Sequence, residues 1–310
     1  MARRIIIDTD PGQDDAVALL LALASPEVEV LGVVAVAGNV PLPLTSRNAR
    51  VVVELSGRPV PVMAGADRPT VRPLVTAEHV HGGTGLDGVE VGEPSLPLDG
   101  RDGVEFIVDT LRAEPPGTVT LCALGPLTNL ALAFARAPDV VGRVQEIVLM
   151  GGGFFEGGNI TPAAEFNVYV DPEAARDVLR AGVPTTIMSL DVTHKALTTK
   201  PRIDAFRALG TRVGDTVAAW TDFFERFDVD KYGSEGAPLH DPCVIAWLLR
   251  PELFAGRLVN VEVETDSELT RGMTVADWWG VTDRPRNATW IRDVDADGLY
   301  ALVAERLGRL

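Results

Sequence analysis

The sequence predicts one α/β domain in which helices flank a doubly wound, mostly parallel sheet, with a few extra strands near the carboxyl terminus. Three observations support this fold class. Short apolar runs rich in β-branched residues recur along the chain, and helical patterns bounded by Gly, Pro or Asp separate them. The 310 residues contain neither a Ser/Gly-rich linker nor an internal repeat, so we expect residues 1–310 to form a single domain.

The elements follow one another in the order of βαβ units. Buried parallel strands are expected at residues 4–7, 29–37, 118–124, 145–150 and 185–190. Helices are expected at residues 14–25, 43–57, 103–114, 126–138 and 171–182. Extra strands over 257–265, 274–279 and 287–294 precede a final helix over 296–307. In such a sheet the ligand crevice lies at the carboxyl ends of the strands, where we expect the functional residues.

Composition excludes several classes of function. With 28 basic and 44 acidic side chains the net charge is −16, which argues against nucleic acid or an anionic membrane surface as the main partner. Apolar runs are too short to cross a bilayer, and the start "MARRIII" lacks the apolar segment of a signal peptide, so we expect a cytoplasmic protein. Cys122 and Cys243 form no disulfide framework or zinc motif and are expected to be buried thiols.

The first predicted strand ends in "DTDPGQDD", which places Asp8, Asp10, Asp14 and Asp15 between two apolar runs. A Pro-Gly turn and the positive end of the following helix explain one or two of these acids. Four carboxylates at one strand end raise one another's pKa unless a cation intervenes. Because no Cys or His is near and carboxylate oxygens are hard ligands, the motif predicts a calcium or magnesium site, with a solvated turn as the alternative.

Other candidates follow later strands. A glycine-rich loop after residue 150 carries Asn159, Glu165 and Asn167, which could hold sugar hydroxyls or simply face water. Leu124 ends a strand before Gly-Pro, where its backbone carbonyl is free to act as a ligand, although a simple turn also explains that stretch. Asp241 precedes Pro242 and is either a helix N-cap or a functional acid.

Histidines provide groups for proton transfer near neutral pH. His240 lies beside Asp241, and His79 and His81 lie in the glycine-rich segment "HVHGGTGLDG". His194, in "DVTHKAL", is expected to be structural.

Taken in order, these motifs resemble the inosine-uridine preferring nucleoside hydrolase family. The resemblance runs from about residue 4 to the carboxyl terminus. Its segments are "DTDPGQDDAVALL", Gly38-Asn39, "HGGTGLDG", "LGPLTNLALA", "LMGGG", "AEFNVYVDPEAA", "DVTHKAL", "GAPLHDP" and "TRGMTV". It implies the nucleoside hydrolase fold, a bound Ca²⁺, hydrolysis of the N-glycosidic bond of ribonucleosides, a role in nucleobase salvage, and a homodimer or homotetramer.

The resemblance also implies residue roles. The metal would be held by Asp10, Asp15, the carbonyl of Leu124 and Asp241, with Asp10 as general base on the attacking water and inversion at the anomeric carbon. Asp8 would orient the ligands without binding the metal. Ribose hydroxyls would be held by Asp14, Asn39, Asn159, Glu165 and Asn167. His240 would assist the leaving base and His81 would lie near it.

The base preference is open at this point, although "HDP" favours a broad or inosine-uridine type over a strictly purine-specific one. Loops near 76–84 and 222–236 are expected to close over the base, with Phe223, Phe224, Phe227 and Tyr232 as candidates. A stripe such as "WTDFFERF" is more often a helix packing its apolar face.

Two other functions fit parts of the sequence. "DTD" at a strand end is similar to haloacid-dehalogenase-type phosphatases, in which Asp8 would be the nucleophile, but Lys195, Lys200 and Lys231 do not sit convincingly at a strand end. A non-catalytic nucleoside- or calcium-binding protein would keep the pocket without turnover. The presence of both Asp10 and His240 argues against that alternative.

Overall fold

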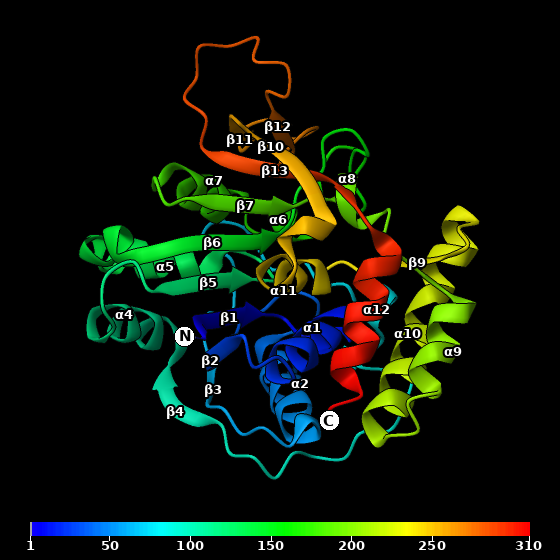
Figure 1. The fold of residues 1–310 in the computed structure, drawn as a ribbon. Helices are drawn as coiled ribbons and strands as arrows, with labels where there is room; N and C mark the ends of the chain where they lie inside the picture. Colours follow the sequence, from blue (N-terminus) through cyan, green and yellow to red (C-terminus); the bar gives the residue numbers. More distant parts are fainter. Residues whose placement is uncertain (1) are drawn as a thin grey trace.

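A nine-stranded sheet in the order β10-β13-β7-β6-β5-β1-β2-β3-β4 forms the centre of the molecule (Figure 1). The structure is a computed structural model that describes residues 2–310, except for the side chains of residues 227–232. The strands of the sheet are β1 (Arg3–Thr9), β2 (Val28–Ala35), β3 (Val62–Ala64), β4 (Asp99–Asp102), β5 (Val119–Ala123), β6 (Val144–Met150), β7 (Thr185–Met188), β10 (Phe254–Val259) and β13 (Ala288–Val294). All neighbours pair in parallel except β10 and β13, which confirms the predicted fold class.

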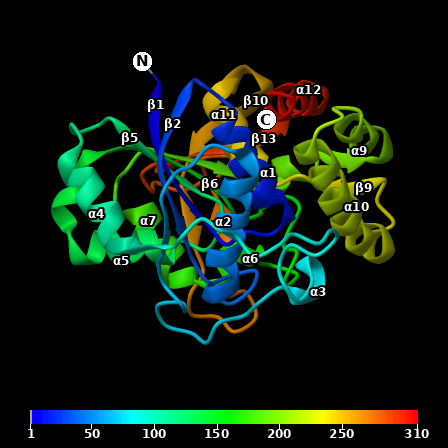
Figure 2. The same cartoon turned by 90° about the horizontal axis from the view of Figure 1, so that it is seen from below.

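Helices cover both faces of the sheet. One face carries α1 (Gln13–Leu23), α2 (Leu42–Ser56), α9 (Lys200–Arg207), α10 (Arg212–Tyr232), α11 (Pro242–Leu249) and α12 (Ala296–Leu307). The other carries α4 (Gly103–Ala113), α5 (Thr128–Arg136) and α7 (Pro172–Arg180), as Figure 2 shows. Among the described residues no helix is both long and apolar enough to span a membrane.

The middle of the central strand β1 is apolar because both of its faces are covered. Ile5 and Ile7 pack with the α1 side, whereas Ile6 packs with the α4 side, as the alternation of side chains along a strand requires. All three are 0–1% exposed, and full burial of such a side chain contributes about 1.5–3 kcal/mol. This packing fixes the register of β1 and therefore the position of the acids that follow it.

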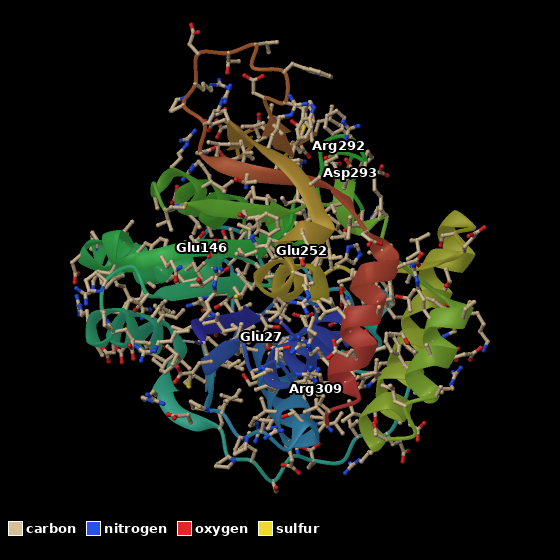
Figure 3. The ribbon with its side chains drawn as sticks, viewed as in Figure 1. Glu27, Glu146, Glu252, Arg292, Asp293 and Arg309 are labelled. Atoms are coloured by element: carbon tan, nitrogen blue, oxygen red, sulfur yellow. The ribbon has the colours of Figure 1, made fainter. Side chains whose placement is uncertain are left out.

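An ion pair links the last helix, α12, to the segment just before β2. Buried Arg306 of α12 donates from Nη1 and Nη2 to the carboxylate of Glu27, at 2.8 and 2.7 Å. Glu27, labelled in Figure 3, lies just before β2. The hydrogen bonds from Arg306 lower the pKa of Glu27. The last helix is thereby tied to the amino-terminal part of the sheet.

The remaining elements are short. They are α3 (Glu78–His81), α6 (Phe166–Val170), α8 (Leu190–Thr193), the antiparallel pairs β8 (Leu197–Thr199) with β9 (Gly236–Pro238) and β11 (Val261–Val263) with β12 (Thr274–Ala276), and two 3₁₀ turns at Pro138–Arg143 and Pro251–Leu253. The segment 222–232, expected as a loop, belongs to the long helix α10.

Candidate active site

The site lies where the strand order reverses. β1 has β2 on one side and β5 on the other, so the connections from these strands run toward opposite edges of the sheet. A crevice opens between them at their carboxyl ends, where Asp10 follows β1 and Leu124 follows β5. The position of the acidic motif is therefore a consequence of the sheet topology.

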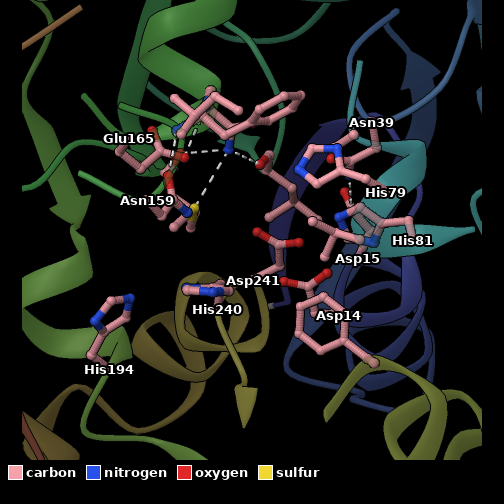
Figure 4. A pocket seen from close by; sticks show the side chains of 18 residues that line it. Asp14, Asp15, Asn39, His79, His81, Asn159, Glu165, His194, His240 and Asp241 are labelled. Carbon is pink, nitrogen blue, oxygen red and sulfur yellow. Dashed lines mark hydrogen bonds between the residues drawn. The ribbon is translucent and has the colours of Figure 1, made fainter. Parts of the chain in front are cut away.

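Every site residue expected from the sequence except Asp10 lines one cavity (Figure 4). These residues are Asp14, Asp15, Asn39, His81, Leu124, Asn159, Glu165, Asn167, His240 and Asp241. Other cavity residues, notably Met150 and Phe166, were not proposed for the site from the sequence. His194 also lines the cavity, although it had been expected to be structural. Of the aromatic candidates near the base, Phe224 lines the cavity, and the side chains of Phe227 and Tyr232 lie outside the described residues.

Three buried carboxylates converge on the floor of the cavity. Asp14 and Asp15, in the first turn of α1, and Asp241, before α11, each place an oxygen within 4.8 Å of the other two (Figure 4). Asp241 occupies the N-cap position of α11, but its side chain makes no capping hydrogen bond. The helix-cap explanation of this acid is therefore not what the structure shows, and its carboxylate is available for the cluster.

Asp15 and Asp10 are held by hydrogen bonds from the turn and from Asn39. Asp15 accepts from the Thr9 hydroxyl and from the Gly12 amide, at 2.9 Å for the latter. The backbone N–H of Asn39 donates to Asp10 Oδ2 at 2.7 Å, and the side-chain Nδ2 of Asn39 donates to Asp15 Oδ2 at 3.3 Å. Asn39 thus links the two acids and fixes their relative position.

Asp10 differs from the other acids because it is not among the residues that line the cavity. It is 1% exposed, and its Oδ1 has no hydrogen-bond partner among the described residues. A Cβ at Gly38 would lie 2.0 Å from Asp10 Oδ2, and one at Gly125 would lie 2.3 Å from Oδ1. Glycine is therefore required on both sides of this carboxylate for it to keep its position.

Burial and mutual repulsion raise the pKa of the acids in this group. Burial is the largest cause, and the charge of Asp15 adds to it, raising the pKa of Asp14 to about 7. The pKa of Asp10 and that of Asp241 are raised well above the usual range, by burial first and then by the neighbouring carboxylates. A set of acids this close and this buried carries its charge only when a cation compensates it.

The donor set fits a hard divalent cation. Asp14, Asp15 and Asp241 offer converging oxygens, Asp10 offers an unpartnered buried oxygen, and neither Lys nor Arg occurs among the described side chains that line the cavity. Cys ligands are absent from the cavity lining, so oxygen-binding calcium or magnesium suits the site better than zinc.

A polar wall faces the carboxylates. Asn167 donates from Nδ2 to the carbonyl of Leu124 at 2.7 Å, which orients that carbonyl beside the cavity. Glu165 caps α6 by accepting from the backbone amides of Asn167 and Val168. Its carboxylate also accepts from the Gly152 amide in the glycine-rich loop. The Asn159 carbonyl oxygen accepts from the Phe166 amide at 3.0 Å. Each of these side chains is therefore held in place by the backbone around the glycine-rich loop.

All four histidines of the chain line the cavity, and His240 and His81 lie on different sides of it (Figure 4). His240 Nδ1 lies 2.8 Å from the Thr193 hydroxyl, and its ring centroid is 5.8 Å from that of His194. Burial lowers the pKa of His240 well below its usual value, with His194 and His81 as smaller causes. His81 stacks on Phe224 with 5.3 Å between ring centroids. Both rings are therefore neutral at pH 7, because burial also lowers the pKa of His81, to about 3.

Asp8 lies outside the cavity lining. Its Oδ2 accepts a hydrogen bond of 2.7 Å from Asn129 Nδ2, and Asn129 in turn accepts from the Ala66 amide at 2.8 Å. Burial raises the pKa of Asp8 to about 7. Asp8 is therefore linked through Asn129 of α5 to the turn after β3 and is not among the residues that line the cavity.

Comparison with known proteins covers nearly the whole chain. Residues 5–301 match the family model described as inosine-uridine preferring nucleoside hydrolase. A pyrimidine-specific ribonucleoside hydrolase, RihA of Salmonella agona, is 48% identical over 309 residues, 99% of each chain, and an uncharacterized protein of Schizosaccharomyces pombe is 54% identical over 308 residues, also 99% of each. The solved structure of a purine-preferring ribonucleoside hydrolase from Gardnerella vaginalis superposes with a TM-score of 0.92 at 30% identity, covering 99% of this chain and 98% of that one.

Proposed function

Because this chain belongs to the inosine-uridine preferring nucleoside hydrolase family, and is thus a ribonucleoside hydrolase, we propose that its carboxylate cluster hydrolyses the N-glycosidic bond with inversion at the anomeric carbon. The observation that carries this proposal is the convergence of three buried acids, with Asp10 linked to them through Asn39, in a cavity lined by amides and histidines. Cleavage of this bond develops positive charge on the sugar, which carboxylates stabilise.

We propose calcium as the cofactor, held by Asp10, Asp15, Asp241 and the Leu124 carbonyl, with Asp14 close by. When bound there, a calcium ion supplies Lewis acidity toward a water molecule and the ribose diol, and it balances the negative charge of the buried acids. The unpartnered Oδ1 of Asp10 supports this assignment, as does the absence of Lys and Arg from the lining side chains that the structure describes.

Asp10 and the residues around the cluster accept the proton of the attacking water and bind the sugar. Asp10 accepts the proton of the attacking water, on the face of the sugar opposite the base. Asp14, Asn39 and Asn167 hold the ribose hydroxyls, and Asn159 and Glu165 hold the 5′ end. The side-chain nitrogen of Asn159, Nδ2, supports this role, because it has no hydrogen-bond partner among the described residues and can donate to a hydroxyl.

His240 assists the departing base. When the Thr193 hydroxyl donates to Nδ1, the neutral ring carries its proton on Nε2, and this N–H donates a hydrogen bond to the leaving nitrogen, which takes its final proton from water. Replacing His240 with Asn should therefore lower kcat by about 10²- to 10⁴-fold for uridine, the usual worth of a positioned acid. The same substitution should have much less effect on p-nitrophenyl riboside, whose leaving group needs no proton. Equal losses on both substrates would contradict this role.

The cavity disfavours the phosphatase alternative. A phosphate group is normally bound by cationic side chains, and the part of the cavity lining that the structure describes contains neither Lys nor Arg. Asp8, which would be the nucleophile in that mechanism, is absent from the lining. A purely binding role is the other alternative, and turnover of any nucleoside would exclude it.

We propose pyrimidine ribonucleosides as the main substrates, since the pyrimidine-specific relative is 48% identical whereas the purine-preferring structure is 30% identical. Ribose release from uridine, cytidine, inosine and adenosine, measured as reducing sugar, tests this directly. We expect kcat/KM to be highest for a pyrimidine nucleoside, and preference for inosine or adenosine would contradict it. A homodimer or homotetramer, a role in nucleobase salvage and a cytoplasmic location stay predictions.

A further inference from the structure

Gln13 lies between the turn and the carboxylates of "DPGQDD" and makes three hydrogen bonds to the segment that carries His81. It is fully buried at the start of α1. Its Nε2 donates to the backbone carbonyls of His81 and Asp87, at 2.9 and 3.0 Å. Its Oε1 lies 2.7 Å from His81 Nδ1.

These partners leave the Gln13 amide only one orientation. Both carbonyl oxygens are acceptors, so the atom of the amide that faces them must be the NH₂ group. The other atom is then a carbonyl oxygen, which only accepts. His81 Nδ1 must carry a proton to complete that bond, and in the neutral ring Nε2 is then an unprotonated acceptor.

The His81 ring is also fixed in position. It stacks on Phe224 with an interplanar angle of 23°, and a Cβ at Gly12 would lie 2.3 Å from Nδ1. The low pKa of His81, caused by burial first and then by His79, keeps the ring neutral. His81 lines the cavity, and its Nε2 has no hydrogen-bond partner among the described residues. The ring therefore offers one fixed lone pair to a ligand.

We infer that Gln13 is a positioning residue that sets the tautomer of His81, so that His81 Nε2 accepts a hydrogen bond from an N–H group of the nucleobase. The inference rests on the proposed function and names the base feature that is read. Bases with such a donor are favoured, as in N3–H of uracil, the amino group of cytosine or N1–H of hypoxanthine. A base whose donor is methylated loses the bond and leaves the acceptor unsatisfied.

The tautomer is tested by NMR of the whole protein with ¹⁵N-labelled histidine, because the chain has only four histidines. We expect His81, assigned from a His81→Asn variant, to carry its proton on Nδ1 in the wild type and to lose this preference in Gln13→Leu. Asn48→Leu is the matched control, since Asn48 donates to the Pro11 and Thr84 carbonyls in the same region but does not touch the His81 ring. A proton on Nε2 in the wild type would overturn the inference, even if Gln13→Leu fails to fold.

The base contact is tested with two substrate pairs, uridine with 3-methyluridine and inosine with 1-methylinosine. Wild type should cleave the unmethylated member about tenfold faster in kcat/KM, the effect of one lost hydrogen bond to a buried acceptor. The ratio should fall toward one in Gln13→Leu and persist in Asn48→Leu. Ribose release with the same ratio in Gln13→Leu as in wild type would overturn the inference alone, whereas no release from any nucleoside would overturn the proposed function with it.

Discussion

Replacing Asp10 with asparagine is expected to lower the rate of ribose release by about 10²- to 10⁴-fold, the usual contribution of a general base. The asparagine side chain introduced at position 10 keeps an oxygen that can accept from the backbone N–H of Asn39, so the fold of the turn should be preserved. The loss should appear in kcat, because the ribose is held by other residues. Initial rates with uridine at saturating concentration measure it.

The matched control is the same change two residues earlier. Asp8 uses one oxygen to accept from Asn129, and asparagine can accept that bond as well. Asp8→Asn should therefore retain far more activity than Asp10→Asn. The reverse order, with Asp8 essential and Asp10 dispensable, would contradict the account and favour a phosphatase-like nucleophile at Asp8.

Replacing Asp191 with alanine is expected to destabilise the protein by about 3–5 kcal/mol, because it leaves one buried indole N–H and three partly buried amides without their acceptor. Asp191 Oδ1 accepts from the amides of Phe154, Phe155 and Glu156, at 3.2, 2.9 and 2.9 Å. Its Oδ2 accepts from Trp290 Nε1 at 2.8 Å, and Trp290 is fully buried. The carboxylate thus ties the glycine-rich loop to the sheet.

Urea unfolding measures this loss, and the KM for uridine should rise in the same variant because the loop also carries Asn159. Asp293→Ala is the control, since this exposed acid, labelled in Figure 3, forms an ion pair with the surface Lys195 and with no other described residue. A surface pair of this kind contributes about 1 kcal/mol or less. A loss of under 1 kcal/mol for Asp191→Ala would contradict the anchoring role.

The sheet could be predicted from the sequence because its strands are buried on both sides. Residues 4–7, 118–124 and 145–150 all lie in or next to the observed β1, β5 and β6, and the final helix has the predicted bounds. β4, "DGRD", gave no such signal, since its residues are mostly exposed and pair only at the edge of the sheet. A pattern of apolar residues indicates a buried strand, and an exposed, polar edge strand has no such pattern.

The site was only partly predictable. The density of acids in "DTDPGQDD" indicated a cation, but which oxygens converge depends on Asp241, more than 200 residues away in the sequence. The roles of Gln13 and Asp191 gave no sequence signal of their own, because each acts through backbone groups that only the folded chain brings close. Ligand-bearing motifs are visible in a sequence, whereas the residues that position them become visible in the structure.

The most direct test of the central claim is ribose release from uridine by the same protein sample before chelation, after removal of metal with EDTA, and after addition of Ca²⁺. The account predicts that activity is lost when elemental analysis shows the metal to be gone and that Ca²⁺ restores it. Full activity in protein shown to be metal-free, or no ribose release from protein shown to contain calcium, would contradict it.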